Sequence, residues 1–214
     1  NEEWLRKQAE ERAARQNDGV ENFGIPGASG KRKVKETNPL RPYERDLLDF
    51  VLNDGLAELK FYKDSPYYCD PPQTVAEFID NSLAADNTDF SDPVYRQTYE
   101  AYFSLYDEGL PQEEILRLLV NADPAVSGCI AELTSRQHEI TEKGLKDSMT
   151  SRDTILLHEV PRAILCYQVE ILEKKSSACQ KTLKEAGANI NEVVREITDI
   201  NRTKRILKEK LSKI

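Results

Sequence analysis

Two stripes of mostly apolar residues near the end of the chain constrain its fold more than any other feature. In each stripe the residues follow one another at alternating spacings of three and four, which is the spacing of a coiled-coil seam. The first stripe comprises Leu165, Val169, Leu172, Ser176, Cys179, Leu183 and Ala186. The second comprises Val193, Ile197, Ile200, Lys204, Leu207, Leu211 and Ile214. Between them lies Gly187-Ala188-Asn189, in which a helix-stopping Gly is followed by an Asn that can cap the next helix.

This pattern predicts two long helices that fold back on each other as an antiparallel hairpin. The second helix, of roughly 25 residues, would extend over roughly 37 Å at the usual rise per residue. A two-helix arm of this kind buries one face of each helix and leaves the other faces open. Such a surface suits docking on another protein better than it suits enclosing a substrate.

Lys204 is the charged residue within the second stripe. Its aliphatic stem could simply fill space in the seam while the ammonium group reaches water. Alternatively, it could fix the register of the hairpin opposite Ser176, because polar residues of two antiparallel stripes would meet near the middle. The sequence leaves both interpretations open.

A bundle of about five or six shorter helices is predicted upstream of the hairpin. Helix-start signals, mostly a Pro at the first turn or an Asp cap before it, occur at Pro42, near Val75, at Asp92-Pro93, at Pro111 and at Asp123-Pro124. Residues 56–72 receive no assignment, and residues 137–151 form a polar connection. Pro161 lies inside a helical run, so the first helix of the hairpin is expected to begin near Glu159 or to kink there.

The predicted fold is therefore all-α, a compact helical bundle followed by a long antiparallel C-terminal helical hairpin. It divides into an N-terminal helical tail with a flexible linker (residues 1–38), the bundle (39–158) and the hairpin (159–214). Charged residues make up 32% of the chain, and there are only 9 Gly, which favours helices over sheets. No apolar run approaches the roughly 18 residues of a membrane span. Because such a run is missing and the chain opens with Asn1 rather than Met, we expect a soluble piece of a longer protein.

The residues capable of catalysis or metal binding show no spacing that predicts a site. The cysteines lack C-x-x-C spacing, which favours reduced thiols over disulfides or a zinc site: Cys69, Cys129, Cys166 and Cys179. His158 and Cys166 could form a nucleophilic pair, but eight residues of helix would separate them by about 12 Å. Without a phosphate-binding Gly loop or a hydrolase motif, we expect neither catalysis, nor a metal, nor a cofactor.

A tyrosine stripe on the helix after Pro93 is expected to be a buried face. Its members could stack single-stranded bases: Tyr95, Tyr99, Tyr102 and Tyr106. The surrounding Asp and Glu residues, including Glu100 and Asp107, would however repel phosphate.

Charge is unevenly distributed along the chain. Residues 160–214 contain 12 Lys and Arg against 7 Asp and Glu, whereas the whole chain has a net charge of −8. A basic arm on an acidic body favours a partner surface of opposite charge.

The run from Pro42 to Leu52, with Glu44-Arg45 and Leu47-Leu48, resembles the first helix of the C-terminal helicase-binding domain of bacterial DNA primases. The stretch from Val160 to Ile214 is similar to the helical hairpin of that domain, and the resemblance covers about residues 40–214. It implies a bacterial, cytoplasmic protein whose primer synthesis lies in an upstream part, since no zinc-binding or polymerase motif of primases is present here. It also implies that the hairpin docks on the replicative hexameric helicase and that the bundle modulates it.

Within the hairpin, we expect the partner contacts at the tip and along the last helix, at Ile190, Val193, Val194, Arg202, Arg205, Lys208 and Leu211. Two alternatives remain. The chain could be the N-terminal domain of a replicative helicase, which would self-associate where the primase domain would be a monomer. It could also be a helical nucleic-acid-binding module that uses the basic run from Lys31 to Lys35 together with the arm.

Overall fold

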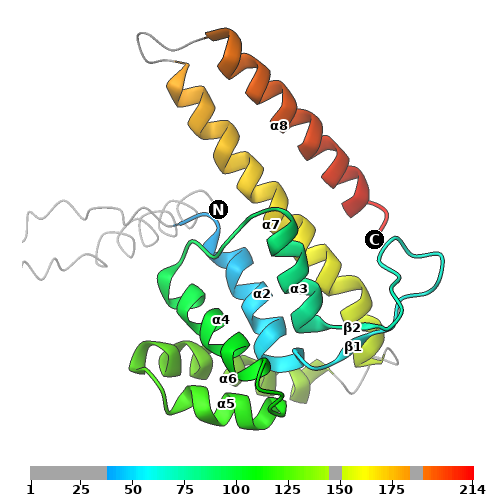
Figure 1. Cartoon of the computed structure of the whole chain (residues 1–214), viewed down its shortest axis with the longest axis vertical. Helices are drawn as coiled ribbons and strands as arrows, with labels where there is room; N and C mark the ends of the chain where they lie inside the picture. Colours follow the sequence, from blue (N-terminus) through cyan, green and yellow to red (C-terminus); the bar gives the residue numbers. More distant parts are fainter. Residues whose placement is uncertain (1–37, 145–150, 184–189) are drawn as a thin grey trace, which may run out of the picture. The chain divides into compact units, whose positions relative to one another are not determined.

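The computed structural model describes residues 38–144, 151–183 and 190–214, without the side chains of residues 135–144. The predicted N-terminal tail, the basic run from Lys31 to Lys35, Ala186 and the break at Gly187 therefore lie outside the described residues. The described part is helical apart from one two-stranded sheet, which confirms the all-α prediction (Figure 1). Its helices are α2 (Arg41–Asp54), α3 (Val75–Ala85), α4 (Pro93–Tyr106), α5 (Gln112–Val120), α6 (Pro124–Gly144), α7 (Arg152–Thr182) and α8 (Ile190–Leu211).

The helices begin where the sequence places start signals. Pro42 lies in the first turn of α2. Backbone N–H groups in the first turn make no hydrogen bond within the helix, so the N–H that Pro lacks costs nothing there. The carboxylate of Asp92 caps α4 by accepting hydrogen bonds from the backbone N–H groups of Val94, at 2.9 Å, and Tyr95, at 3.3 Å. Thr74 and Glu77 form a reciprocal capping box at the start of α3. These local interactions explain why the helix starts were predictable.

Helix α2 is the centre of the bundle and packs against α3, α4, α5, α6 and α7. Its inward face carries Leu47, Leu48, Val51 and Leu52, all of which are fully buried. Burial of apolar area of this kind supplies the main favourable term in folding. The tyrosine stripe of α4 also packs into this core, with Tyr95 and Tyr102 buried and Tyr99 and Tyr106 half-buried, which confirms the prediction of an inward face.

The stretch that the sequence left unassigned forms the small sheet and a loop. Strand β1 (Glu58–Leu59) pairs antiparallel with β2 (Gln73–Thr74). In the loop between them, Phe61 and Tyr67 pack on Phe78 of α3, with ring centroids 5.6 Å apart in each case. A pair of short strands gives too little periodicity to be recognised in a sequence.

Two helices are longer than predicted. Helix α6 continues to Gly144, into the stretch expected to be a polar connection. Helix α7 begins at Arg152 and contains Pro161. Of the two alternatives for this proline, the helix start near Glu159 was therefore wrong, and the helical run continues through Pro161. The first turns of α7 bury Leu156 and Val160 against the bundle, and this packing offsets the hydrogen bond that a helical Pro cannot donate. The proposed boundary between residues 158 and 159 therefore falls inside a continuous helix.

Candidate protein-interaction surface

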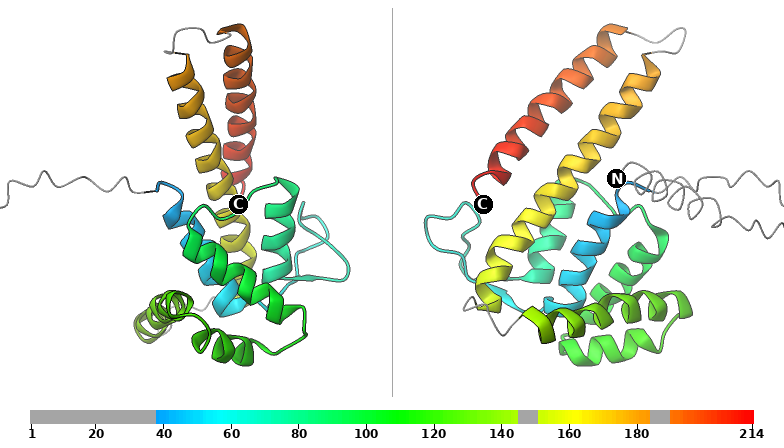
Figure 2. Two further views of the ribbon diagram at one scale, coloured as in Figure 1. Left: turned by 60° about the vertical axis from the view of Figure 1, so that its left-hand side comes forward. Right: turned by 180° about the vertical axis from the view of Figure 1, so that it is seen from behind.

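The hairpin predicted at the end of the chain is present and is formed by α7 and α8. The two helices run antiparallel and lie side by side in both views of Figure 2. Helix α7 also packs against α2, α3 and β1, whereas α7 is the principal neighbour of α8 among the described elements. The 31 residues of α7 therefore serve both subdomains, the first part in the bundle and the second part in the hairpin.

The seam between α7 and α8 consists of the two predicted stripes. On α8 the stripe is the least exposed face, with Ile200 buried and its other members half-buried except for the terminal Ile214. On α7 the described members are buried or half-buried, and Ser176 is only 5% exposed. Ala186 lies outside the described residues. The alternating spacing therefore identified the contact faces of both helices correctly.

Lys204 does more than fill space in the seam. Its Nζ atom donates a hydrogen bond to Oε2 of Glu173 on α7, at 3.0 Å, and Nζ of Lys208 lies 3.6 Å from the other carboxylate oxygen. The hydrogen bond from Lys204, followed by the charges of both lysines, lowers the pKa of Glu173. The polar partner of Lys204 across the seam is thus Glu173, which lies about one helical turn before Ser176, the residue that the sequence placed opposite Lys204.

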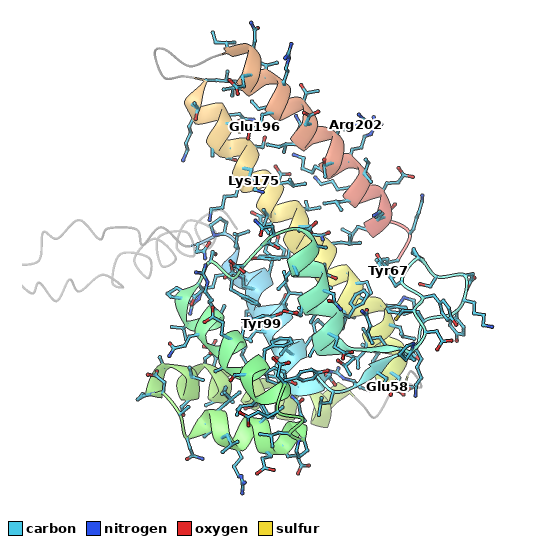
Figure 3. The ribbon with its side chains drawn as sticks, in the orientation of Figure 1. Glu58, Tyr67, Tyr99, Lys175, Glu196 and Arg202 are labelled. Atoms are coloured by element: carbon cyan, nitrogen blue, oxygen red, sulfur yellow. The ribbon has the colours of Figure 1, made fainter. Side chains whose placement is uncertain are left out.

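The candidate contact residues divide into an outward and an inward group. Ile190 and Val194 are 62% and 47% exposed at the start of α8 and form a small exposed apolar pair. Arg202, Arg205 and Lys208 are exposed farther along α8, and Figure 3 shows Arg202 on the side away from α7. The contact role of these five residues stays a prediction.

Val193 and Leu211 belong to the inward group. Both are half-buried because they are members of the seam stripe. Leu211 also lines a concavity of about 420 Å³ where the end of α8 approaches α7, together with Ile214 and Cys166. Val193 and Leu211 are thus partly covered within the seam, and their contact role also stays a prediction.

A second concavity, of about 320 Å³, lies between α2 and α7 and shares Arg162 and Cys166 with the first. Asp49 lines it, and burial, followed by the nearby charges of Asp46 and Asp54, raises the pKa of Asp49 to about 6. Burial also raises the pKa of the Cys166 thiol, which disfavours the reactive thiolate. His158 and Cys166 line the same concavity, but no hydrogen bond joins them among the described interactions.

A buried carboxylate, that of Glu44, ties α7 to the bundle, a role that its place in the Pro42–Leu52 run did not predict. Glu44 of α2 is fully buried and accepts hydrogen bonds from the backbone N–H and the hydroxyl of Ser91, both at 2.6 Å, and from the N–H of Asp92 at 3.1 Å. The hydroxyl of Tyr167, on α7, lies 3.3 Å from the same carboxylate. Glu44 shares the helix face of Leu47 and Leu48, which is the signal that could have identified it.

The described residues contain no group of three or more His, Cys, Asp or Glu side chains that could hold a metal ion. None of the described helices is long and apolar enough to cross a membrane. The candidate surface thus consists of the exposed faces of α8, which packs on α7 along its seam face. Beside it lie the two concavities that share Arg162 and Cys166, and both are lined by acidic and basic side chains.

Comparison with curated proteins and with solved structures finds no match to this chain. A family model does match residues 32–214, which include every described helix and strand. It is described as a domain of unknown function, DUF8430, and the match extends over both the bundle and the hairpin. Because it spans most of the sequence, the chain belongs to the DUF8430 family.

Proposed function

We propose that this chain is a non-catalytic protein-interaction domain whose helical hairpin binds a replicative hexameric helicase. The main observation behind the proposal is that α8 packs against α7 along one of its faces. The other faces of its 22 residues are open to a partner. In this proposal the domain belongs to a bacterial, cytoplasmic primase whose catalytic part lies elsewhere, and it couples primer synthesis to the replication fork.

The start of α8 supplies an apolar anchor. Ile190 and Val194 are one helical turn apart, so their exposed side chains share a face. Protein interfaces typically depend on a few such side chains that enter apolar pockets of the partner. Because both side chains are exposed, they contribute little to the stability of the free domain and are available to a partner.

The later part of α8 supplies charge. Arg202 and Arg205 are exposed, and neither forms an ion pair among the described residues. Lys208, in contrast, lies 3.6 Å from a carboxylate oxygen of Glu173. Cations that are not engaged within the domain are available to an acidic partner surface, where they would speed association and fix orientation.

The identity of the partner rests on the resemblance of residues 40–214 to the helicase-binding domain of primases. The resemblance begins with the α2 sequence from Pro42 to Leu52, whose Glu44 accepts a hydrogen bond from Tyr167 of α7 in this chain.

The proposal is tested with the purified domain and the cognate helicase. The variant Ile190→Asp/Val194→Asp places two charges at the tip without changing the seam, so it should retain the parent's helical content. We expect it to weaken binding to the helicase by at least about tenfold, as loss of an interface anchor commonly does. Binding is measured by surface plasmon resonance, and helical content by circular dichroism.

The matched control is Leu118→Asp/Val120→Asp, which makes the same change at two exposed positions of α5, 41% and 46% exposed in the parent. This variant should bind as the parent does. Equal loss of affinity in both variants would contradict docking through the hairpin tip. Salt-dependent binding to single-stranded DNA, with no binding to the helicase, would instead favour the nucleic-acid-binding alternative.

A further inference from the structure

Helices α3 and α4 leave a trough between them on the surface of the bundle. Both helices pack against α2, but neither is a principal neighbour of the other. The hydroxyl of Tyr99, on α4, donates a hydrogen bond across the gap to Oδ1 of Asp80 on α3, at 2.8 Å. At one end, the hydroxyls of Thr74 and Tyr106 lie 3.0 Å apart. The open concavity between the two helices, which we call the α3–α4 trough, has a volume of about 570 Å³.

The floor of the trough is aromatic. The rings of Tyr99 and Phe103 have centroids 4.6 Å apart, and those of Phe103 and Tyr106 are 5.6 Å apart. All three side chains are only half-buried, although they adjoin the buried core. Toward the loop before α4 the floor continues to Phe90, whose ring centroid lies 4.8 Å from that of Tyr99, beside a smaller hollow of about 170 Å³.

The rim of the trough is acidic. Glu77 and Asp80 come from α3, Glu100 from α4, and Asp107 from the end of α4. None of these carboxylates forms an ion pair with a Lys or Arg among the residues that the structure describes. Burial, followed by the hydrogen bond and charge of Asp80, raises the pKa of Tyr99, so the floor stays neutral beneath this charge.

We propose that the α3–α4 trough binds an arginine-bearing segment of a partner protein. A guanidinium group is attracted to the faces of Tyr and Phe rings, and it can pair with a carboxylate at its edge. The trough offers both kinds of contact within one concavity that two helices have left unfilled. Nucleic acid does not fit this surface, because the rim carboxylates would repel phosphate. This docking surface is separate from the proposed contacts on α8 and does not depend on them.

The test is a titration of the ¹⁵N-labelled chain, followed by NMR, with a short acetylated and amidated peptide. The peptide carries two arginines one helical turn apart in an alanine background, and the same peptide with citrulline at both positions removes the charge while keeping the shape. The arginine peptide should shift backbone signals of trough residues such as Asn81 and Ser104. The citrulline peptide should not.

The variant Asp80→Asn/Glu100→Gln should weaken binding of the arginine peptide by at least about fivefold, whereas the control Asp64→Asn/Glu113→Gln should weaken it by less than about twofold. The control removes the same number and kind of charges outside the trough, and Asn at position 80 keeps the acceptor for Tyr99. Shifts spread over the whole acidic surface, equal effects of the two double variants, or no binding at all would overturn the proposal.

Discussion

At the scale of single residues, Gly55 and Tyr102 approach so closely that position 55 has room only for a hydrogen atom. A Cβ there would lie 2.1 Å from the Tyr102 hydroxyl oxygen and 2.4 Å from the carbonyl oxygen of Val51. The same hydroxyl donates to Gln112, whose amide group donates to the carbonyls of Val51 and Leu52 near the end of α2. The glycine is thus required by a close approach rather than by an unusual φ, which is −53°.

We expect Gly55→Ala to lower the free energy of unfolding by about 2 kcal/mol or more, because either Tyr102 or the end of α2 must move. Thermal and urea denaturation of the parent and the variant measure this change. Gly128→Ala is the matched control, since a Cβ at position 128 meets no atom within 4 Å and Ala favours the interior of α6. If both substitutions left stability unchanged or raised it, the close packing of Gly55 against Tyr102 would be refuted.

At the scale of elements, the seam makes α8 dependent on α7. Leu207 is a half-buried member of the stripe, whereas the preceding residue, Ile206, is 47% exposed. Leu207→Asp should place a charge in the seam and cost about 2 to 4 kcal/mol, which is enough to separate α8 from α7. Helical content should fall and helicase binding should be lost, while the cooperative melting of the bundle persists because it has its own core.

Ile206→Asp is the control for that prediction, because it introduces the same charge one position away on the open face. It should keep the amide hydrogen exchange protection of α8, whereas Leu207→Asp should lose it. Equal protection in the two variants would mean that α8 does not rely on the seam. An unchanged affinity of Leu207→Asp for the helicase would mean that the hairpin is not the docking element.

The elements also show which parts of the fold were readable from the sequence. The seam and the starts of α4 and α5 depend on spacing and caps within a few residues, and the sequence predicted them. The start of α7 at Arg152 could not be fixed, because Pro161 left two alternatives open, a helix start near Glu159 or a kink within a longer helix. Burial of Val160 and Pro161 in the bundle outweighs the cost of a Pro inside the helix. Contacts such as that between Glu44 and Tyr167 join residues 123 positions apart, so no local pattern encodes them.

The same distinction applies to the candidate site. Exposure of Val194 could be anticipated, because it lies off the heptad positions of α8. Exposure of Ile190 could not, because it lies three residues before Val193 and so continues the heptad spacing. The α3–α4 trough could not be anticipated, because its aromatic floor and acidic rim come together only when α3 and α4 both pack on α2. Seen in sequence, the tyrosines of α4 predicted a buried face, and the structure adds that the side of this stripe nearest α3 remains half-open.

At the scale of the whole molecule, charge is separated between the hairpin and the rest of the chain. Residues 160–214 carry 12 cationic against 7 anionic side chains, within a chain whose net charge is −8. Since α7 is one continuous helix shared by the bundle and the hairpin, a partner that binds α8 acts on an element that also contacts α2 and α3. This continuity gives a physical route by which docking on the hairpin could affect the bundle.

The charge separation leads to a kinetic prediction for helicase binding. If the basic face of α8 meets an acidic surface, the association rate constant should fall as the salt concentration rises, while the dissociation rate constant changes less. Stopped-flow measurements over a range of ionic strengths check this. Arg202→Gln/Arg205→Gln should flatten the dependence, and Lys60→Gln/Lys63→Gln, in the loop after β1, should leave it unchanged. An association rate that is indifferent to salt would show instead that docking depends on the apolar tip, at Ile190 and Val194, without electrostatic steering.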